Sequence, residues 1–172
     1  MSFLELSEER YSCRSLTNKP IEEEKIQAII RTAVNAPTAV NYQPFKVWVI
    51  ESPEALALAK STCTQPFIQP APVIFVIGGD PSKAWVRRYD GKNFVDVDAG
   101  IIATQMMLEI QDLGLGTTWV GGFDPAQMKA HFPEMEGYEL IAMFPVGVPS
   151  EDAQPGSAHT RYKPEEELVV RI

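Results

Sequence analysis

Near the start of the chain, two guanidinium groups and a hydroxyl lie within one short segment, Arg10-Tyr11-Ser12-Cys13-Arg14. Such a group can bind a phosphate, because guanidinium groups donate charge-assisted and bidentate hydrogen bonds to its oxygens. The same spacing also occurs in exposed arginine pairs that bind nothing. Taken alone, the segment is a candidate phosphate site.

Three further segments carry groups suited to a planar heteroaromatic ligand or to its charges. Residues 36–44 (APTAVNYQP) hold neutral donors and acceptors, among them Thr38 and Asn41, and two prolines stiffen the segment. Residues 119–122 (WVGG) end in paired glycines, which let backbone N–H groups approach a ligand closely. Residues 159–161 (HTR) supply a second basic pair. On composition alone, each segment could equally be an ordinary loop, turn or tail.

Other chemistries find less support in the sequence. Residues 114–119 (GLGTTW) begin like a dinucleotide-binding fingerprint, but they leave an expected helix and enter an expected strand, the reverse of the required order. His131 and His159 lie far apart, with no cysteine or acidic cluster at ligand spacing, so we expect no metal site. Cys13 has no positioned histidine base and no GxSxG motif occurs, so no catalytic nucleophile is expected.

The charge and composition of the chain limit its partners. With 15 basic and 23 acidic residues, the formal net charge is −8, which disfavours a nucleic-acid binder because such proteins need a basic face. The longest apolar stretches are only as long as a strand, so we expect no membrane span. The N-terminus lacks the basic and apolar regions of a signal peptide. The two cysteines form no CxxC pair, so we expect a reduced, cytoplasmic protein.

The pattern of apolar residues predicts one α+β domain over residues 1–172, because helices and strands are mixed without strict alternation. Helices are expected at 2–9, 20–37, 53–61, 96–113 and 125–130, and strands at 45–50, 73–78, 117–120, 140–148 and 168–172. The helix at 96–113 has apolar residues on more than one stripe, so we expect it to be buried on most sides, partly by a second subunit. The polar, aromatic loop at 79–94 has the length of a lid or binding loop. The strand at 168–172 follows a loose tail and should pair with a distant segment or another chain.

Five segments, in this order and at this spacing, resemble the FMN-dependent nitroreductase family and together span nearly the whole chain. They are RYSCR at 10–14, APTAVNYQP at 36–44, DVDAG at 96–100, GLGTTWVGGF at 114–123 and HTRYKPEEELV at 159–169. The resemblance implies a mixed, mostly antiparallel sheet flanked by helices, in a homodimer whose subunits exchange C-terminal strands. It also implies that FMN binds at the subunit interface.

The resemblance further implies a set of cofactor-binding residues, with no catalytic side chain and no metal ligand. The implied residues are Arg10, Tyr11, Ser12, Arg14, Pro37, Thr38, Ala39, Asn41, Trp119, Val120, Gly121, Gly122, His159 and Arg161. The arginines, the serine and the histidine would hold the FMN phosphate and the pyrimidine edge of the ring, and Tyr11 would contribute its backbone. The residues from Pro37 to Asn41 would reach the flavin from the partner subunit, while Val120 and the glycines would line the ring. Trp119 would pack behind the ring or in the core.

The activity that the resemblance implies is an NAD(P)H-dependent FMN oxidoreductase. A hydride would pass from NADH or NADPH via FMN to a nitroaromatic, quinone or similar small acceptor in a ping-pong cycle, because FMN supplies the chemistry and the protein supplies binding and orientation. The loop at 79–94 would cover the open face of the flavin. A specialised dehalogenating or flavin-fragmenting relative, a flavin-binding carrier or sensor without turnover, and a non-flavin interaction module remain alternatives.

Overall fold

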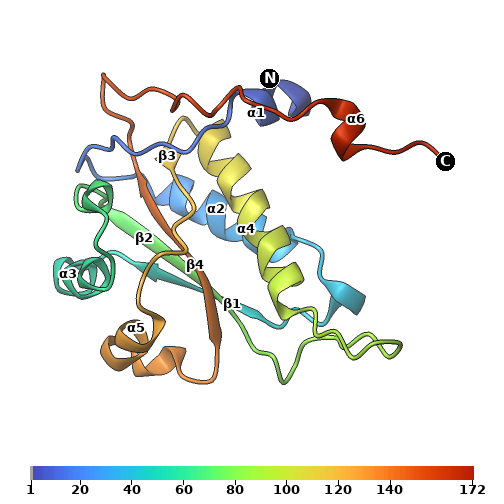
Figure 1. The fold of residues 1–172 in the computed structure, drawn as a ribbon. Helices are drawn as coiled ribbons and strands as arrows, with labels where there is room; N and C mark the ends of the chain where they lie inside the picture. The colour runs from blue at the N-terminus through green and yellow to red at the C-terminus, as the bar shows by residue number, and fades with distance from the viewer. Residues whose placement is uncertain (1) are drawn as a thin grey trace.

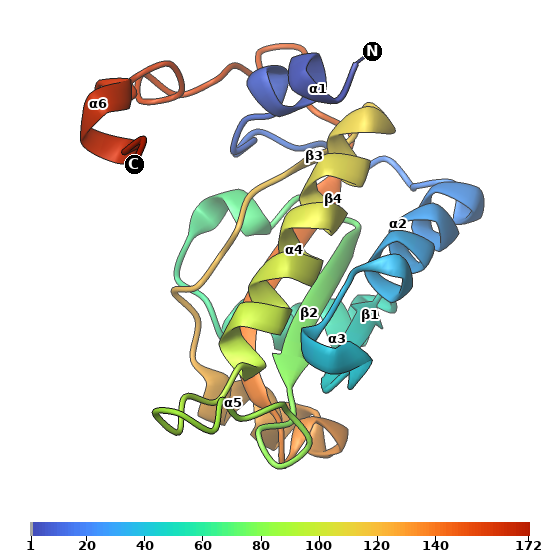
Figure 2. The same ribbon diagram turned by 90° about the vertical axis from the view of Figure 1, so that its right-hand side faces the viewer.

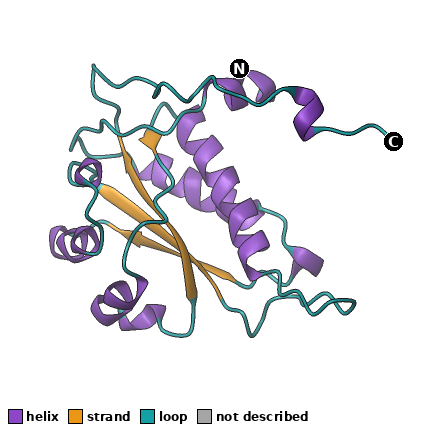
Figure 3. Cartoon of the chain, in the orientation of Figure 1, coloured by secondary structure: helices purple, strands orange, loops and turns teal. Residues whose placement is uncertain are grey.

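The computed structural model describes residues 2–172 and is built on a four-stranded sheet with helices on both sides (Figures 1 and 3). The strands are β1 (Phe45–Ile50), β2 (Val73–Gly79), β3 (Gly116–Thr117) and β4 (Glu139–Gly147). They lie in the order β1-β2-β4-β3, and these pairings are antiparallel. The helices are α1 (Phe3–Glu9), α2 (Glu23–Asn35), α3 (Pro53–Ser61), α4 (Val95–Asp112), α5 (Pro125–His131) and α6 (Glu165–Leu168), with short turns η1 (Ala39–Asn41), η2 (Pro66–Ile68) and η3 (Pro133–Met135). The α+β fold class is confirmed.

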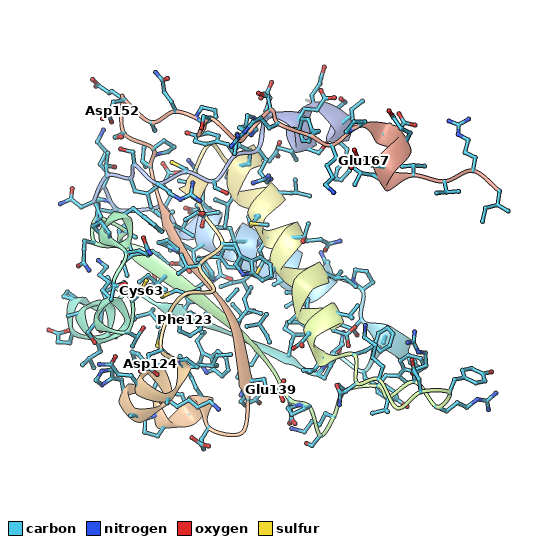
Figure 4. The ribbon with its side chains drawn as sticks, in the orientation of Figure 1. Cys63, Phe123, Asp124, Glu139, Asp152 and Glu167 are labelled. Carbon is cyan, nitrogen blue, oxygen red and sulfur yellow. The ribbon has the colours of Figure 1, made fainter. Side chains whose placement is uncertain are left out.

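Two cores lie on the two faces of the sheet, and β2 contributes to both. Helices α2 and α4 pack against each other over one face, where they meet Phe75 and Ile77 of β2 (Figure 2). On the other face, Ile74 of β2 packs into a core that includes Cys63 and Phe123, on the side of α3 and α5 (Figure 4). A strand whose alternate side chains are buried on opposite faces must be apolar throughout. The apolar run VIFVIG accordingly lies in a central strand, between β1 and β4.

Local sequence signals explain where several helices begin and end. Ser2 caps α1 in a capping box with Glu5, because each side chain accepts a hydrogen bond from the other residue's backbone N–H. Ser52 caps α3, with Pro53 at the first helical position. After α4 the chain turns at Gly114, whose φ of +70° is a left-handed conformation that glycine adopts at little cost.

Residues 80–94, where a loop was expected, form a hairpin. Val86 and Asn93 pair in an isolated antiparallel bridge, and the rings of Trp85 and Phe94 meet edge to face with their centroids 4.8 Å apart. The hairpin projects beyond the sheet near the start of α4 (Figures 1 and 2). Tyr89, near its tip, is 83% exposed. The hairpin therefore exposes the ring of Tyr89, while the contact between Trp85 and Phe94 stabilises it.

The strand expected at 168–172 does not form within the single chain. Residues 165–168 form the short helix α6, and the residues after it pair with no strand of the described chain. The tail runs past α1 and leaves the body of the molecule, with Glu167 on α6 also outside it (Figures 1 and 4). Val170 is 79% exposed. A strand needs a neighbour to accept and donate its backbone hydrogen bonds, and no such neighbour lies here.

Within a single chain, helix α4 is fully buried on one side only. One side, with Ile102, Met106 and Ile110, is fully buried against the sheet and α2. The other side carries Val97, which is exposed, and Ile101, which is only partly covered. Burial on most sides is thus not reached within one chain. An apolar stripe remains open along α4.

Candidate functional site

The segment from Arg10 to Arg14 lines a cavity of about 270 Å³ next to the C-terminal tail. Its lining residues are Arg10, Tyr11, Ser12, Arg14, Gly156, Ala158, His159 and Tyr162. Five of the residues that the resemblance implies for FMN binding therefore lie together, although His159 is far from the others in the sequence. The rings of Tyr11 and His159 meet edge to face, with their centroids 6.3 Å apart.

The fold fixes this segment by attaching it to the sheet. The backbone N–H of Cys13 donates to the carbonyl of Thr117, the last residue of the short strand β3, at 2.8 Å. The Cys13 side chain is buried beside Gly116, where an added Cβ would lie 2.7 Å from the Cys13 sulfur. Ser12 and Arg14, the neighbours of Cys13 in the chain, line the cavity. Because successive side chains of an extended segment point to opposite sides, one residue anchors the segment while its two neighbours line the cavity.

A second cleft, of about 240 Å³, lies on the other side of Arg14. It is lined by Arg14, Gln65, Phe67, Thr118, Trp119, Val120, Gly121 and Gly122. Arg14 therefore lines both the cavity and the cleft that contains the two glycines. Trp119 packs edge to face against the buried ring of Phe144, with centroids 5.5 Å apart, yet stays 38% exposed at the cleft. It belongs both to the core and to the cleft wall.

The charges of the cavity are not neutralised inside the chain. Four salt bridges are formed among residues 2–172, and none of them involves Arg10 or Arg14. Partial burial, together with a hydrogen bond to Cys13 and its charge, raises the pKa of Tyr11 to about 12. The phenol is therefore neutral at ordinary pH and adds no negative charge to the cavity. In a chain with a net charge of −8, such an uncompensated cationic pocket suits an anion.

Six residues that line these two clefts were not predicted from the sequence: Gln65, Phe67, Thr118, Gly156, Ala158 and Tyr162. Gln65 and Phe67 precede β2 in a loop with no recognisable motif, and Tyr162 follows the HTR segment without being singled out. Phe67 carries the guanidinium of Arg14 over its ring, 5.8 Å from the ring centre. The signal that could have found the loop is its pair of prolines around a glutamine and two large apolar residues, which resembles the segment at 36–44.

The segment with Pro37, Thr38, Ala39 and Asn41 does not reach either cleft in the same chain. It lies at the start of α4, where the backbone N–H of Ala39 donates to the carboxyl group of Asp98 at 2.8 Å. Arg10 and Tyr11 lie at the other end of that helix, next to Ile110 and Gln111. Arg161 is exposed and lines neither cleft. One chain therefore assembles only part of the implied set.

The described range, residues 2–172, holds neither a cluster of metal ligands nor a membrane-spanning helix. No group of three or more His, Cys, Asp or Glu side chains in this range could hold a metal ion. No helix in it combines the length and the apolar composition required to cross a bilayer.

Comparisons with known proteins identify the family. The model of the nitroreductase family matches residues 8–62 and 53–148. A nitroreductase family protein of known structure from Clostridium difficile is 33% identical, with a TM-score of 0.89 over 99% of this chain and 98% of that one. A Bacillus subtilis protein named FMN reductase (NAD(P)H) is 28% identical over 124 residues, which cover 64% of this chain and 50% of that protein. An Exiguobacterium sibiricum protein solved in complex with FMN shares the fold at 19% identity, with a TM-score of 0.86 over 100% of this chain and 98% of that one. The family match spans most of the chain, and the chain belongs to the nitroreductase family.

Proposed function

We propose that this protein is an FMN-dependent oxidoreductase that uses NADH or NADPH to reduce a nitroaromatic, quinone or similar small acceptor. The observation that carries the proposal is the position of Arg14, which lines both the cationic cavity and the glycine-lined cleft. A ligand with a phosphate at one end and a flat ring at the other needs such a pair of adjoining sites. The similar proteins named for FMN or solved with it support the same cofactor.

The residues present fit FMN by their chemistry. Arg10, Arg14 and the hydroxyl of Ser12 would bind the phosphate, with His159 from the tail closing the cavity. Among residues 2–172, the backbone N–H groups of Gly121 and Gly122 have no acceptor, so they are available to the edge of a bound ring. An added Cβ at Gly122 would meet nothing within 4 Å, which leaves the backbone open to a close approach.

Bound FMN supplies the redox chemistry, because its ring accepts a hydride from a nicotinamide and returns electrons to a second substrate. The chain's own groups would bind FMN, orient its ring and shield it from solvent. Uncompensated positive charge and backbone N–H groups beside the ring favour the form that carries more negative charge. Since no side chain is required as an acid or base, we assign no catalytic residue.

We further propose that the working unit is a homodimer with FMN at the interface. Helix α4 has 18 residues and is therefore about 27 Å long. Arg10 lies beside one end of it and the Pro37–Asn41 segment beside the other. Two chains with antiparallel α4 helices would bring the Arg10 end of one to the Pro37–Asn41 end of its partner. The same arrangement would cover the open apolar stripe that includes Val97.

The exposed tail and the open sheet edge suggest how the two chains also exchange strands. Strand β1 is at the edge of the sheet, and a groove of about 490 Å³ runs beside it, lined by residues 47–50 with Phe132 and Met135. An unpaired edge attracts another strand. We expect residues 168–172 of the partner, which are apolar except for Arg171, to occupy it.

The hairpin at 80–94 would help to select the substrate. Because it projects from the Pro37–Asn41 end of the chain, it would lie over the cofactor held by the partner's arginines. Tyr89 is the side chain in position to touch a substrate, whereas Trp85 is engaged with Phe94.

The first experiment is the visible absorption spectrum of the purified protein, followed by identification of any chromophore released on heating. We expect a flavin spectrum with about one FMN per chain, and rapid bleaching by NADH or NADPH that a nitroaromatic or quinone reverses. The double variant Arg10→Ala with Arg14→Ala should purify colourless, while Arg31→Ala, on an exposed part of α2, should stay yellow. A colourless wild type that takes up no added FMN would refute the proposal. Flavin that neither nucleotide reduces would indicate a carrier or sensor.

A further inference from the structure

Asp98 carries a buried carboxyl group, and only one of its two oxygens has a hydrogen-bond partner among residues 2–172. It lies in the first turns of α4 and is 1% exposed. One oxygen accepts the backbone N–H of Ala39 at 2.8 Å. The other oxygen has less than 1 Å² of accessible surface and no hydrogen-bond partner among residues 2–172. A buried polar atom without a partner costs stability and calls for an explanation.

The loop that Asp98 contacts has an unfavourable backbone. Val40, Asn41 and Gln43 have φ values of 55°, 56° and 51°, all in the left-handed region. Asparagine enters this region more readily than most residues, but for a β-branched valine it is a true outlier. Such strain persists only where the surroundings hold it.

Side-chain packing does not hold this loop. The side chain of Val40 is 63% exposed, and that of Tyr42 is also exposed. Hydrogen bonds hold it instead: Asn41 donates its N–H to the carbonyl of Thr38, and Gln43 donates its N–H to the Thr38 hydroxyl, both at 3.0 Å. These bonds lie within the loop. The carboxyl group of Asp98 ties the loop to the rigid helix α4.

We propose that Asp98 is a positioning residue for the cofactor: by accepting the Ala39 N–H, it holds residues 38–43 in the strained conformation that meets FMN. The proposal rests on the proposed function for its ligand. It assigns Asp98 no contact with FMN, because the side chain is sealed from solvent behind the loop.

The burial of Asp98 argues for this role rather than for simple helix stabilisation. Acidic residues in a first turn stabilise a helix through its dipole even when they are exposed. Asp96, in the same turn, is exposed and can do so without loss of hydration. Burial of Asp98 adds a desolvation cost and returns one hydrogen bond to the loop. In this proposal, the hydrogen bond from Ala39 to Asp98 fixes the conformation of the loop.

The first test measures FMN binding by the full-length chain freed of cofactor, using the quenching of flavin fluorescence. We expect Asp98→Ala to raise the dissociation constant by about tenfold or more, the loss expected for one strong positioning hydrogen bond. Asp98→Asn keeps an acceptor oxygen and should bind within a few-fold of wild type. Asp96→Ala is the matched control from the same turn and should bind as wild type does. Thermal unfolding checks that each variant folds, and Asp98→Ser replaces the alanine variant if that one does not.

The second test asks whether the loop has lost its conformation. Amide hydrogen exchange at residues 39–43 of the cofactor-free chain should be faster in Asp98→Ala than in wild type and Asp96→Ala. Adding Val40→Asn to Asp98→Ala should recover part of the lost affinity, because asparagine enters the left-handed region more readily than valine.

Equal affinity and equal exchange in Asp98→Ala, Asp96→Ala and wild type would overturn the proposal. A loss of affinity with unchanged exchange would also overturn it, because Asp98 would then act otherwise than through the loop. A wild type that binds no FMN would instead refute the proposed function. The exchange measurement would still decide whether Asp98 holds the loop.

Discussion

The guanidinium of Arg14 lies over the ring of Phe67, with its central carbon 5.8 Å from the ring centre. Arg14 is the residue common to the cationic cavity and the glycine-lined cleft, so its orientation affects both. Phe67 is half-buried and held at its place by η2. The ring therefore restrains a side chain that would otherwise have many rotamers.

Removing that ring should weaken cofactor binding without removing a charge. A cation–π contact at a partly exposed site contributes about 0.5–1 kcal/mol, so Phe67→Leu should raise the FMN dissociation constant about two- to fivefold. Phe67→Tyr keeps the ring face and is the control. Flavin fluorescence titration measures both variants. If Phe67→Leu binds as tightly as Phe67→Tyr, the ring does not orient Arg14.

The hairpin residues Tyr89 and Trp85 should affect different properties. Tyr89→Ala should change KM for the acceptor and leave thermal stability unchanged, because its side chain is exposed. Trp85→Ala removes the contact with Phe94 and should loosen the hairpin, since an edge-to-face pair contributes about 0.5–1.5 kcal/mol beyond its buried area. Neither variant should lose flavin. Steady-state kinetics with several acceptors, beside flavin content, tests this, and unchanged kinetics in both variants would contradict it.

The base of the hairpin should weaken in acid. Hydrogen bonds from Lys83 and Ser82 lower the pKa of Asp80 to about 2 from 3.8. The pKa of Asp80 is lower in the folded than in the unfolded chain. The ionised carboxylate therefore stabilises the fold fully above its unfolded pKa, and this contribution is lost as the pH falls from about 4 towards 2. Thermal unfolding at a series of pH values should show wild type above Asp80→Asn at neutral pH, with the difference disappearing in that window.

Lys83→Met removes the other partner of this ion pair and gives a matched comparison. It should reduce the same pH-dependent difference, because the lysine supplies the largest contribution to the low pKa of Asp80. A difference between wild type and Asp80→Asn that persists unchanged to about pH 2 would contradict the assignment.

The C-terminal tail should be needed for assembly. Val169→Asp with Val170→Asp places two charges where we propose that the partner's sheet edge receives the tail. Each buried valine contributes about 1.5–3 kcal/mol, so the double variant should sediment as a monomer and lose its flavin. Glu166→Gln with Glu167→Gln alters the same tail without removing apolar surface and should remain dimeric. A fully dimeric, yellow aspartate variant would show that the tail docks elsewhere or not at all.

The helices and strands that were predicted best are those whose capping residues or apolar pattern lie within or directly beside their own residues. The helix at 53–61 has its cap and proline directly before and at its start, and the structure has it at Pro53–Ser61. The strand FKVWVI occupies Phe45–Ile50 as predicted. The tail at 168–172 has the composition of a strand, yet it pairs with no strand of the described chain. In the dimer that we propose, its neighbour would belong to the partner subunit, and the local sequence carries no signal for that pairing.

The site was predictable where it depends on residue types and less so where it depends on the backbone. The Arg10–Arg14 segment and His159 do line one cavity. The left-handed conformation of Val40 could not be read from a β-branched residue, which disfavours it. Asp98 was hidden for a similar reason: an acid in a first helical turn is ordinarily explained by the helix dipole, and burial leaves no mark in the sequence.

The placement of Arg10 and Asn41 at opposite ends of α4 has a genetic consequence. In the proposed dimer, each cofactor takes its phosphate ligands from one chain and its loop contacts from the other. An allele damaged at Arg10 and an allele damaged in the loop would each produce inactive enzyme alone. Expressed in one cell, they would form mixed dimers in which one site carries both defects and the other carries neither. Two null alleles would thus complement each other.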